Sequence, residues 1–181
     1  MSKYYLMAQK IPNNGTVIRK MSHSRTRLKT GGFLPSGFQP PLCCQLLGKF
    51  SGGTMSTFYQ SPAVIGTKRF YQDLLDCGVD NMEVQPVVIT DTVKNITFDN
   101  YLLLNIIGKV ACADLEKSEY TEIGEGMNTV DKLVIDGVKT NGLLLFLLAE
   151  DTDCIVIHEQ VYNHLQSKGY TDIYFEELEQ V

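Results

Sequence analysis

Apolar and polar positions divide the chain into a turn-rich first third and a strongly patterned remainder. Residues 3–8 are mostly apolar and predict a short first strand. Residues 30–62 contain six glycines and four prolines, a composition typical of turns and irregular chain. We therefore expect one domain over residues 1–181, with a loop-rich region over 1–62 and an α+β core over 63–181.

Two strand-helix-strand units are predicted within this core. In the first, the apolar run 63–65 precedes Thr67, a suitable helix N-cap, and Gly78 suits the left-handed stop after an apolar helical stripe. In the second, the run 155–157 leads to a similar helix, then Gly169 and a strand over 173–178. A constant offset of 91 positions relates Tyr71 to Tyr162, Leu74 to Leu165 and Gly78 to Gly169. Internal duplication and the chance likeness of two amphipathic helices both explain this match.

Further strands are predicted between and around these units. Residues 83–89 read as a strand in which Pro86 favours an edge position or a bulge, and 101–113 as a long apolar strand broken near Gly108. Residues 132–136 and 143–149 read as a hairpin, because Asp-Gly and Asn-Gly turn signals stand at both ends of their connection. The expected fold class is α+β, with a mainly antiparallel mixed sheet.

Charge is distributed very unevenly along the chain. All 21 acidic residues lie from Asp73 onward, and residues 1–72 contain 10 of the 16 Lys and Arg residues. The formal balance therefore runs from +10 in the first part to −15 in the second, which the net charge of −5 conceals. Such polarity steers charged partners and says more about binding than about catalysis.

The densest acidic cluster lies between residues 114 and 131, where Lys117 alone opposes six carboxylates. A row of carboxylates can imitate nucleic-acid phosphates before a basic partner, and an ordinary solvated loop is the competing interpretation. Acidic residues at 150–153 and 176–179 can extend the surface. The candidate partner-binding residues are Asp114, Glu116, Glu119, Glu122, Glu125 and Asp131.

A basic segment offers the alternative binding site. Lys and Arg residues gather among Ser and Thr before residue 30, as in a phosphate-binding arm, although a solvated loop or a charged edge hairpin has the same composition. The candidate nucleic-acid-binding residues are Arg19, Lys20, Arg25, Arg27 and Lys29.

The sequence predicts no catalytic constellation, metal site or cofactor. The five cysteines lack CxxC spacing, so we expect reduced and mostly packed thiols. His158 and His164 are six residues apart, which places them about 240° apart on a helix and excludes the i, i+4 pair of a zincin. We expect capping or surface roles for them and a solvated His23. The sequence therefore favours a protein that is not an enzyme.

No membrane span or secretory signal is expected. The longest strongly apolar run, 143–149, is far shorter than the roughly 20 residues that cross a bilayer. The first residues lack the charged, apolar and small-residue zones of a signal peptide. These features predict a cytoplasmic protein.

The order of several segments in the last two thirds of the chain resembles that of immunity protein family 11, a family of bacterial toxin-immunity proteins. The segments are NMEVQPV at 81–87, YLLLNII at 101–107, DLEKS at 114–118, DKLVID at 131–136, LFLL at 145–148 and IVI at 155–157. The resemblance implies a cytoplasmic antidote, encoded beside a polymorphic or secretion-system toxin, that binds this toxin and blocks it. It implies no catalytic residues.

A stoichiometric inhibitor of a cognate toxin, for example a nuclease, is therefore the first functional hypothesis. A nucleic-acid-binding regulator that uses the basic segment is the alternative. An enzyme comes third, since no catalytic constellation is found.

Overall fold

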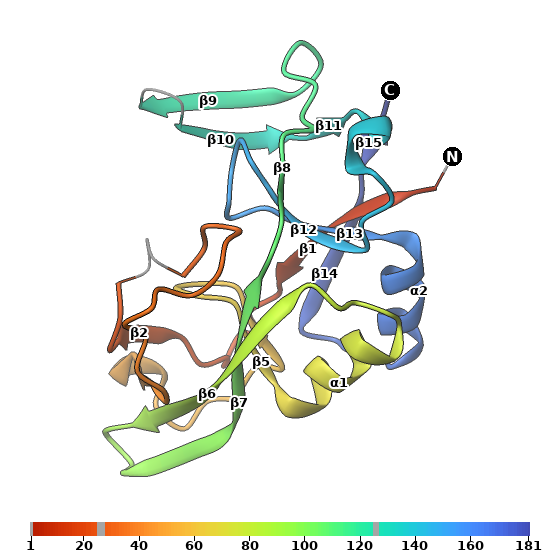
Figure 1. The fold of residues 1–181 in the computed structure, drawn as a ribbon. Helices are drawn as coiled ribbons and strands as arrows, with labels where there is room; N and C mark the ends of the chain where they lie inside the picture. The colour runs from red at the N-terminus through yellow and green to blue at the C-terminus, as the bar shows by residue number, and fades with distance from the viewer. Residues whose placement is uncertain (1, 25–27, 125–126) are drawn as a thin grey trace.

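A computed structural model describes residues 2–24, 28–124 and 127–181, and gives only the backbone for the strand residues between 122 and 131. Within these ranges, two main sheets and two α-helices form the body of the molecule (Figure 1). Most strand pairs are antiparallel and a few are parallel. The predicted α+β fold with a mainly antiparallel mixed sheet is confirmed.

Among the described strands, the chain passes between the two main sheets twice, from β1 (Tyr4–Gln9) to β2 (Ile18–Met21) and from β7 (Ile96–Ile106) to β8 (Lys109–Val110). The strand β7 runs in one sheet and continues after Gly108 as β8 in the other; Gly108 has φ +127°, which suits glycine at the predicted break. One sheet has the order β14 (Ile173–Glu177), β1 (Tyr4–Gln9), β13 (Ile155–His158), β12 (Leu145–Leu148) and β8 (Lys109–Val110). The other has the order β2 (Ile18–Met21), β3 (Leu42–Leu46), β6 (Met82–Asp91), β7 (Ile96–Ile106), β5 (Ile65–Thr67) and β4 (Phe58–Tyr59).

Both predicted strand-helix-strand units are present, one in each sheet. In the first, α1 (Lys68–Asp76) connects β5 to β6, and these two strands flank β7 and run antiparallel to it. In the second, α2 (Glu159–Ser167) connects β13 to β14, which flank β1 in the same manner. The helices lie side by side (Figure 1).

The two units also share caps and strand register. Thr67 Oγ1 accepts a hydrogen bond from the Phe70 amide, and His158 Nδ1 accepts one from the Gln160 amide, so both N-caps obey the 91-residue offset. Gly78 and Gly169 end the helices with positive φ, as predicted. Equivalent strand pairs are Thr67–Tyr101 with His158–Tyr4, and Met82–Ile106 with Ile173–Gln9. This agreement supports internal duplication over chance likeness.

The core has three layers of apolar contacts. The inner layer fills the space between the two sheets and the helices and includes Met7, Phe70, Leu74, Ile157 and Val161. A second cluster lies on the other face of the six-stranded sheet, where segments before residue 62 cover it. A third lies on the other face of the five-stranded sheet, where Cys112, Ala113, Leu133 and Ile135 pack against it.

Residues 1–62 are an integral part of both sheets. β1 lies between β13 and β14, and β3 lies between β2 and β6. The prediction of irregular chain for 30–62 is wrong at β3, where Leu42, Cys44 and Leu46 are buried and the residues between them are exposed. Glycine and proline on both sides of this short strand hid its alternation.

The predicted hairpin over 132–149 is wrong. Its first predicted strand contains β11 (Val134–Ile135), which pairs with β15 (Glu179–Gln180). Its second contains β12, which pairs with β13 and β8. The turn signals belong to a 3₁₀ helix, η3 (Gly137–Thr140): Asp136 caps its start and Asn141 leaves it with φ +51°. A second 3₁₀ helix, η2 (Gly48–Phe50), follows β3.

Pro86 lies in an interior strand, unlike the edge strand that its presence suggested. β3 pairs with β6 only from Val87 onward, so Pro86 precedes the segment with partners on both sides. A register shift follows between Val87 and Ile89, which agrees with the alternative prediction of a bulge.

Candidate functional site

A two-stranded extension carries the acidic cluster. β9 (Glu119–Gly124) pairs with β10 (Met127–Lys132), and among the described strands these two pair only with each other. Figure 1 shows them extending beyond the two main sheets. We call the turn 114–118 together with this hairpin the arm.

The base of the arm is firmly attached to the body. Ser118 Oγ accepts from the Val134 amide at 2.9 Å and donates to the Val134 carbonyl at 3.1 Å. The Asp114 carboxylate accepts from the amides of Glu116 and Lys117, at 3.1 and 3.2 Å, and pairs with Lys117 Nζ at 3.5 Å. Asp114 therefore shapes the turn, and its predicted role as a contact residue has no support in this geometry.

The exposed side chains on the arm are both apolar and acidic. Leu115 and Tyr120 are each 42% exposed, and Glu116 and Glu119 are exposed beside them in sequence. Glu125 lies outside the described residues, and Glu122 and Asp131 are described by their backbone alone. Of the six predicted acidic residues, the structure thus supports Glu116 and Glu119 as available for contact.

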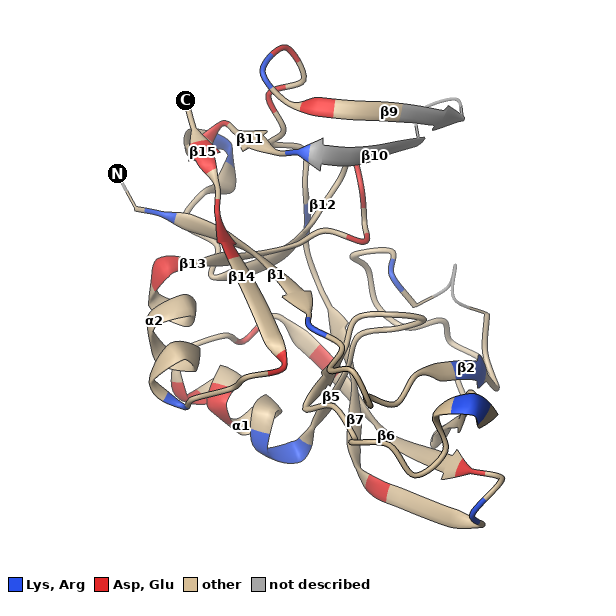
Figure 2. Cartoon of the chain, turned by 180° about the vertical axis from the view of Figure 1, so that it is seen from behind, with Lys and Arg blue, Asp and Glu red and all other residues tan. Residues whose placement is uncertain are grey.

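Most acidic residues predicted to extend this surface have local partners. Glu177 pairs with Lys3 at 2.8 Å, and this contact lowers the pKa of the Glu177 carboxyl. Glu179 pairs with Lys132 at 2.9 Å, which raises the pKa of the Lys132 ammonium. Glu150 Oε1 accepts from the Ala113 amide, at 3.3 Å. Figure 2 shows acidic residues on several elements, among them β9, β14 and β15.

The basic segment is divided by the fold. Arg19 and Lys20 are exposed on β2, the edge strand of the six-stranded sheet, whereas Arg25 and Arg27 lie outside the described residues. Lys29 has a side chain only 5% exposed, and its Nζ lies 2.6 Å from Asp153 Oδ1. Lys29 is therefore a buried ion-pair residue, and this geometry gives no support to its predicted contact with nucleic acid.

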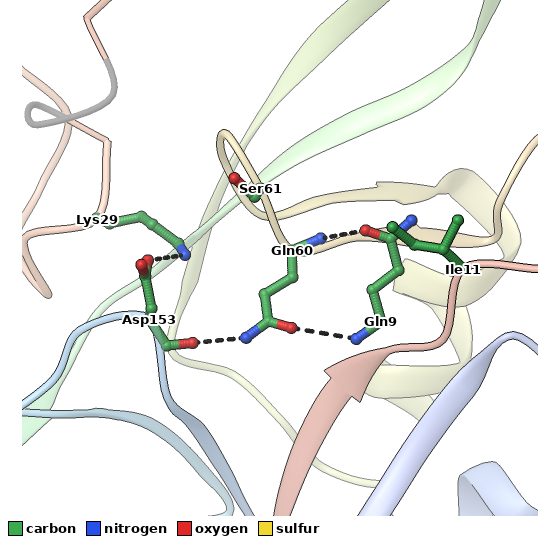
Figure 3. A pocket seen from close by; sticks show the side chains of 6 residues that line it. All are labelled: Gln9, Ile11, Lys29, Gln60, Ser61 and Asp153. Atoms are coloured by element: carbon green, nitrogen blue, oxygen red, sulfur yellow. Dashed lines mark hydrogen bonds and ion pairs between the residues drawn. The ribbon is translucent and has the colours of Figure 1, made fainter. Parts of the chain in front are cut away.

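The Lys29–Asp153 pair lines an open cavity of about 280 Å³ (Figure 3). Gln60 connects this pair to β1: its Nε2 donates to the Asp153 carbonyl at 2.6 Å, and its Oε1 accepts from the Gln9 amide at 3.1 Å. These contacts join three distant parts of the sequence. The polar residues that line the cavity therefore hold parts of the fold together, and the charge of Lys29 is already balanced by Asp153.

Three of the five thiols are poorly suited to nucleophilic chemistry. Burial raises the pKa of Cys44, Cys112 and Cys154 to about 12, so these groups remain protonated at neutral pH. Ser22 Oγ lies 3.0 Å from His23 Nδ1, but His23 Nε2 accepts from the Gln39 amide at 3.5 Å. This leaves the Ser22–His23 contact without the carboxylate that orients the base of a catalytic triad.

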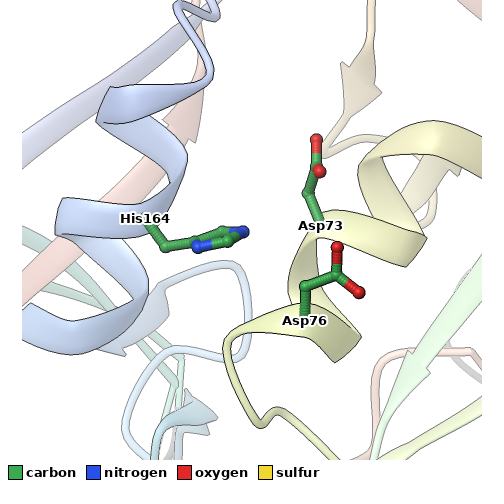
Figure 4. Close-up of side chains that lie close together, drawn as sticks. All are labelled: Asp73, Asp76 and His164. Carbon is green, nitrogen blue, oxygen red and sulfur yellow. The ribbon is translucent and has the colours of Figure 1, made fainter.

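One cluster that the sequence did not indicate lies between the helices. Asp73 and Asp76 on α1 and His164 on α2 have ligand-type atoms within 4.8 Å of one another (Figure 4). His164, for which a capping or surface role was expected, lies half-buried in the last turn of α2, and its Nε2 is buried without a hydrogen-bond partner. His158 caps α2, as expected. Only helix packing brings His164 to α1, and no local sequence signal predicts it.

Comparisons with known proteins do not assign the chain to a class. No family model matches it, and no curated protein matches it. Among the described helices, neither is long and apolar enough to span a membrane.

Proposed function

We propose that this protein is a bacterial immunity protein, which binds a cognate toxin in the cytoplasm and neutralises it by stoichiometric inhibition. The resemblance of the ordered segments between residues 81 and 157 to immunity protein family 11 supports this proposal. The structural observation that carries it is the arm, a hairpin outside both main sheets with exposed apolar and acidic side chains.

The arm has the composition of a contact surface for a basic protein. Tyr120 supplies a large, amphipathic side chain of the kind that anchors protein interfaces, and Leu115 adds apolar area. Glu116 and Glu119 supply negative charge at its exposed positions. Such charges accelerate the encounter with a basic partner, whereas the anchor slows dissociation. A nuclease toxin, whose active site binds phosphates, is the partner that this charge favours.

Co-expression with the product of the neighbouring toxin-like gene tests the proposal. The wild-type chain restores growth and forms a one-to-one complex with the toxin. Tyr120→Ala weakens the complex by about 30-fold, the effect of a residue worth about 2 kcal/mol. Tyr174→Ala is the matched control, because Tyr174 is 49% exposed but lies on β14, away from the arm. Equal loss in both variants contradicts the assignment to the arm.

Charge reversal tests the acidic part separately. Glu116→Lys with Glu119→Lys slows association with a basic toxin and reduces its dependence on salt. Adding reversals at Glu122 and Glu125 extends the test to the whole predicted cluster. Asp99→Lys, at an exposed position on β7 in the six-stranded sheet, is the control. If reversal of all four residues changes neither affinity nor salt dependence, the acidic site is wrongly assigned.

Nucleic-acid binding remains a second candidate, supported by the exposure of Arg19 and Lys20 on an edge strand. It predicts salt-sensitive binding of nucleic acid in the absence of a protein partner. Arg19→Glu with Lys20→Glu abolishes that binding if this function is correct and leaves toxin neutralisation intact if it is not.

A further inference from the structure

The seam between α1 and α2 brings together three metal-ligating side chains. Asp73 and Asp76 are three residues apart on α1, so they lie on the same side of that helix. His164 comes from α2 and occupies the position that the 91-residue offset relates to Asp73. Figure 4 shows its imidazole directed from α2 toward the two carboxylates. The ligands thus come from both halves of the repeat.

The His164 ring nitrogen is the unsatisfied group in this seam. Its Nε2 is buried without a hydrogen-bond partner. A ligand-type nitrogen of the same ring and one oxygen of each carboxylate lie within 4.8 Å of one another. A buried polar atom left unpaired costs about 1–3 kcal/mol. Figure 4 shows the ring facing the two carboxylates, an arrangement that a bound cation would satisfy.

The carboxylates are already oriented by neighbouring groups. Asp73 is 6% exposed and accepts hydrogen bonds from the Tyr170 hydroxyl and from Lys168 Nζ, the latter at 3.0 Å. Asp76 accepts from Gln72 Nε2 at 2.8 Å. Burial favours the neutral Asp73 carboxyl, but the bonds from Tyr170 and Lys168 outweigh it and lower its pKa. Each carboxylate retains free lone pairs for a metal ion.

We propose that Asp73, Asp76 and His164 bind a divalent first-row transition-metal ion, best matched by zinc, that links the two helices. One imidazole and two carboxylates form a ligand set that zinc accepts, with one further position open to water. In a tetrahedral zinc site, ligand atoms about 2.1 Å from the metal are about 3.4 Å from one another. The three groups, whose ligand atoms lie within 4.8 Å of one another, therefore need to close by up to about 1.4 Å, and exposed Asp76 has the freedom to move.

Lys168 provides a sharp test, because its ammonium and the metal ion compete for Asp73. Removing this charge with Lys168→Gln raises zinc affinity, whereas His164→Gln and Asp76→Asn each lower it at least tenfold. His164 is half-buried and Asp76 is exposed, so the His164→Gln and Asp76→Asn variants are expected to retain the fold.

Isothermal titration of the full chain with zinc chloride measures these effects. Cys43 is an exposed thiol and a rival zinc ligand, so Cys43→Ser is the control and retains full binding. The expected result is that the wild type binds one zinc ion per chain and that the His164 and Asp76 variants lose this binding. Addition of zinc is also expected to raise the melting temperature of the wild type. The proposal is overturned if wild type binds no zinc, if Cys43→Ser abolishes binding, or if His164→Gln binds as wild type does.

Discussion

The buried ion pair between Lys29 and Asp153 is expected to respond very differently to loss of its two members. The Lys29 side chain is 5% exposed and that of Asp153 is 50% exposed. Asp153→Asn leaves a buried ammonium without its carboxylate, whereas Lys29→Met leaves a carboxylate that water can solvate. The exposed fractions of the two side chains therefore predict a large loss of stability for Asp153→Asn and a small change for Lys29→Met.

The magnitudes follow from the cost of an unpaired buried charge. Breaking a buried pair from one side costs about 3–5 kcal/mol. The adjoining cavity of about 280 Å³ admits water to the ammonium, so we expect the lower end, about 3 kcal/mol, for Asp153→Asn. Lys29→Met removes the buried charge altogether and changes stability by less than about 1 kcal/mol. The double variant behaves like Lys29→Met.

Urea denaturation of the four proteins measures this asymmetry. With an m-value of about 2 kcal/mol/M, Asp153→Asn lowers the unfolding midpoint by about 1.5 M, and adding Lys29→Met restores most of the loss. Equal destabilisation by the two single variants would contradict the predicted difference between them, because it would mean that both charges are equally solvated. So would a midpoint for Asp153→Asn within about 0.3 M of wild type.

Three further outcomes test local features. Gly66→Ala costs about 1–3 kcal/mol in urea denaturation, because its Cβ would lie 2.8 Å from Phe70 Cδ1, whereas Gly37→Ala meets no atom within 4 Å and leaves the midpoint unchanged. Thr67→Ala removes the N-cap of α1 and lowers stability by about 1 kcal/mol; Thr67→Ser retains most of it. Burial alone would raise the pKa of the Asp91 carboxyl, but hydrogen bonds from four donors lower it in the folded state. The ionised carboxylate therefore stabilises the fold at pH values above the pKa of Asp91 in the unfolded chain. This stabilisation is lost as the pH falls through the pKa of Asp91 in the folded state. Melting temperature against pH therefore falls less steeply on acidification in Asp91→Asn than in wild type.

Local sequence patterns were sufficient for the two repeated units. Each helix start has a side-chain acceptor, each helix stop has a glycine with positive φ, and each apolar stripe packs into the inner core. These features depend on contacts within a few residues. The sequence could not show that β1, at the start of the chain, completes the second unit, because that pairing spans more than 150 residues.

The errors arose where distant contacts override local signals. Turn residues around 137 and 142 indicated a hairpin, but β15 from the end of the chain takes β11 as its partner. Lys29 looked like an exposed cation because its partner Asp153 is 124 residues away. His164 was assigned to the surface because helix periodicity does not show which neighbour faces it. The sequence showed where the acidic cluster lies but not the β9–β10 hairpin that carries it. It also did not distinguish Asp114, which shapes a turn, from the exposed Glu116.

The most direct test of the proposed function is the rate at which the chain associates with its cognate toxin, measured against salt concentration. Stopped-flow mixing of wild type and the Glu116→Lys, Glu119→Lys variant gives both rates and their salt dependence. We expect the wild type to associate rapidly with the toxin, at a rate that falls as the salt concentration rises. The variant is expected to associate more slowly, and its rate to depend less on salt. Toxin binding with identical rates and salt dependence in both proteins would contradict docking through the acidic arm, and absence of any binding to the toxin would contradict the immunity function itself.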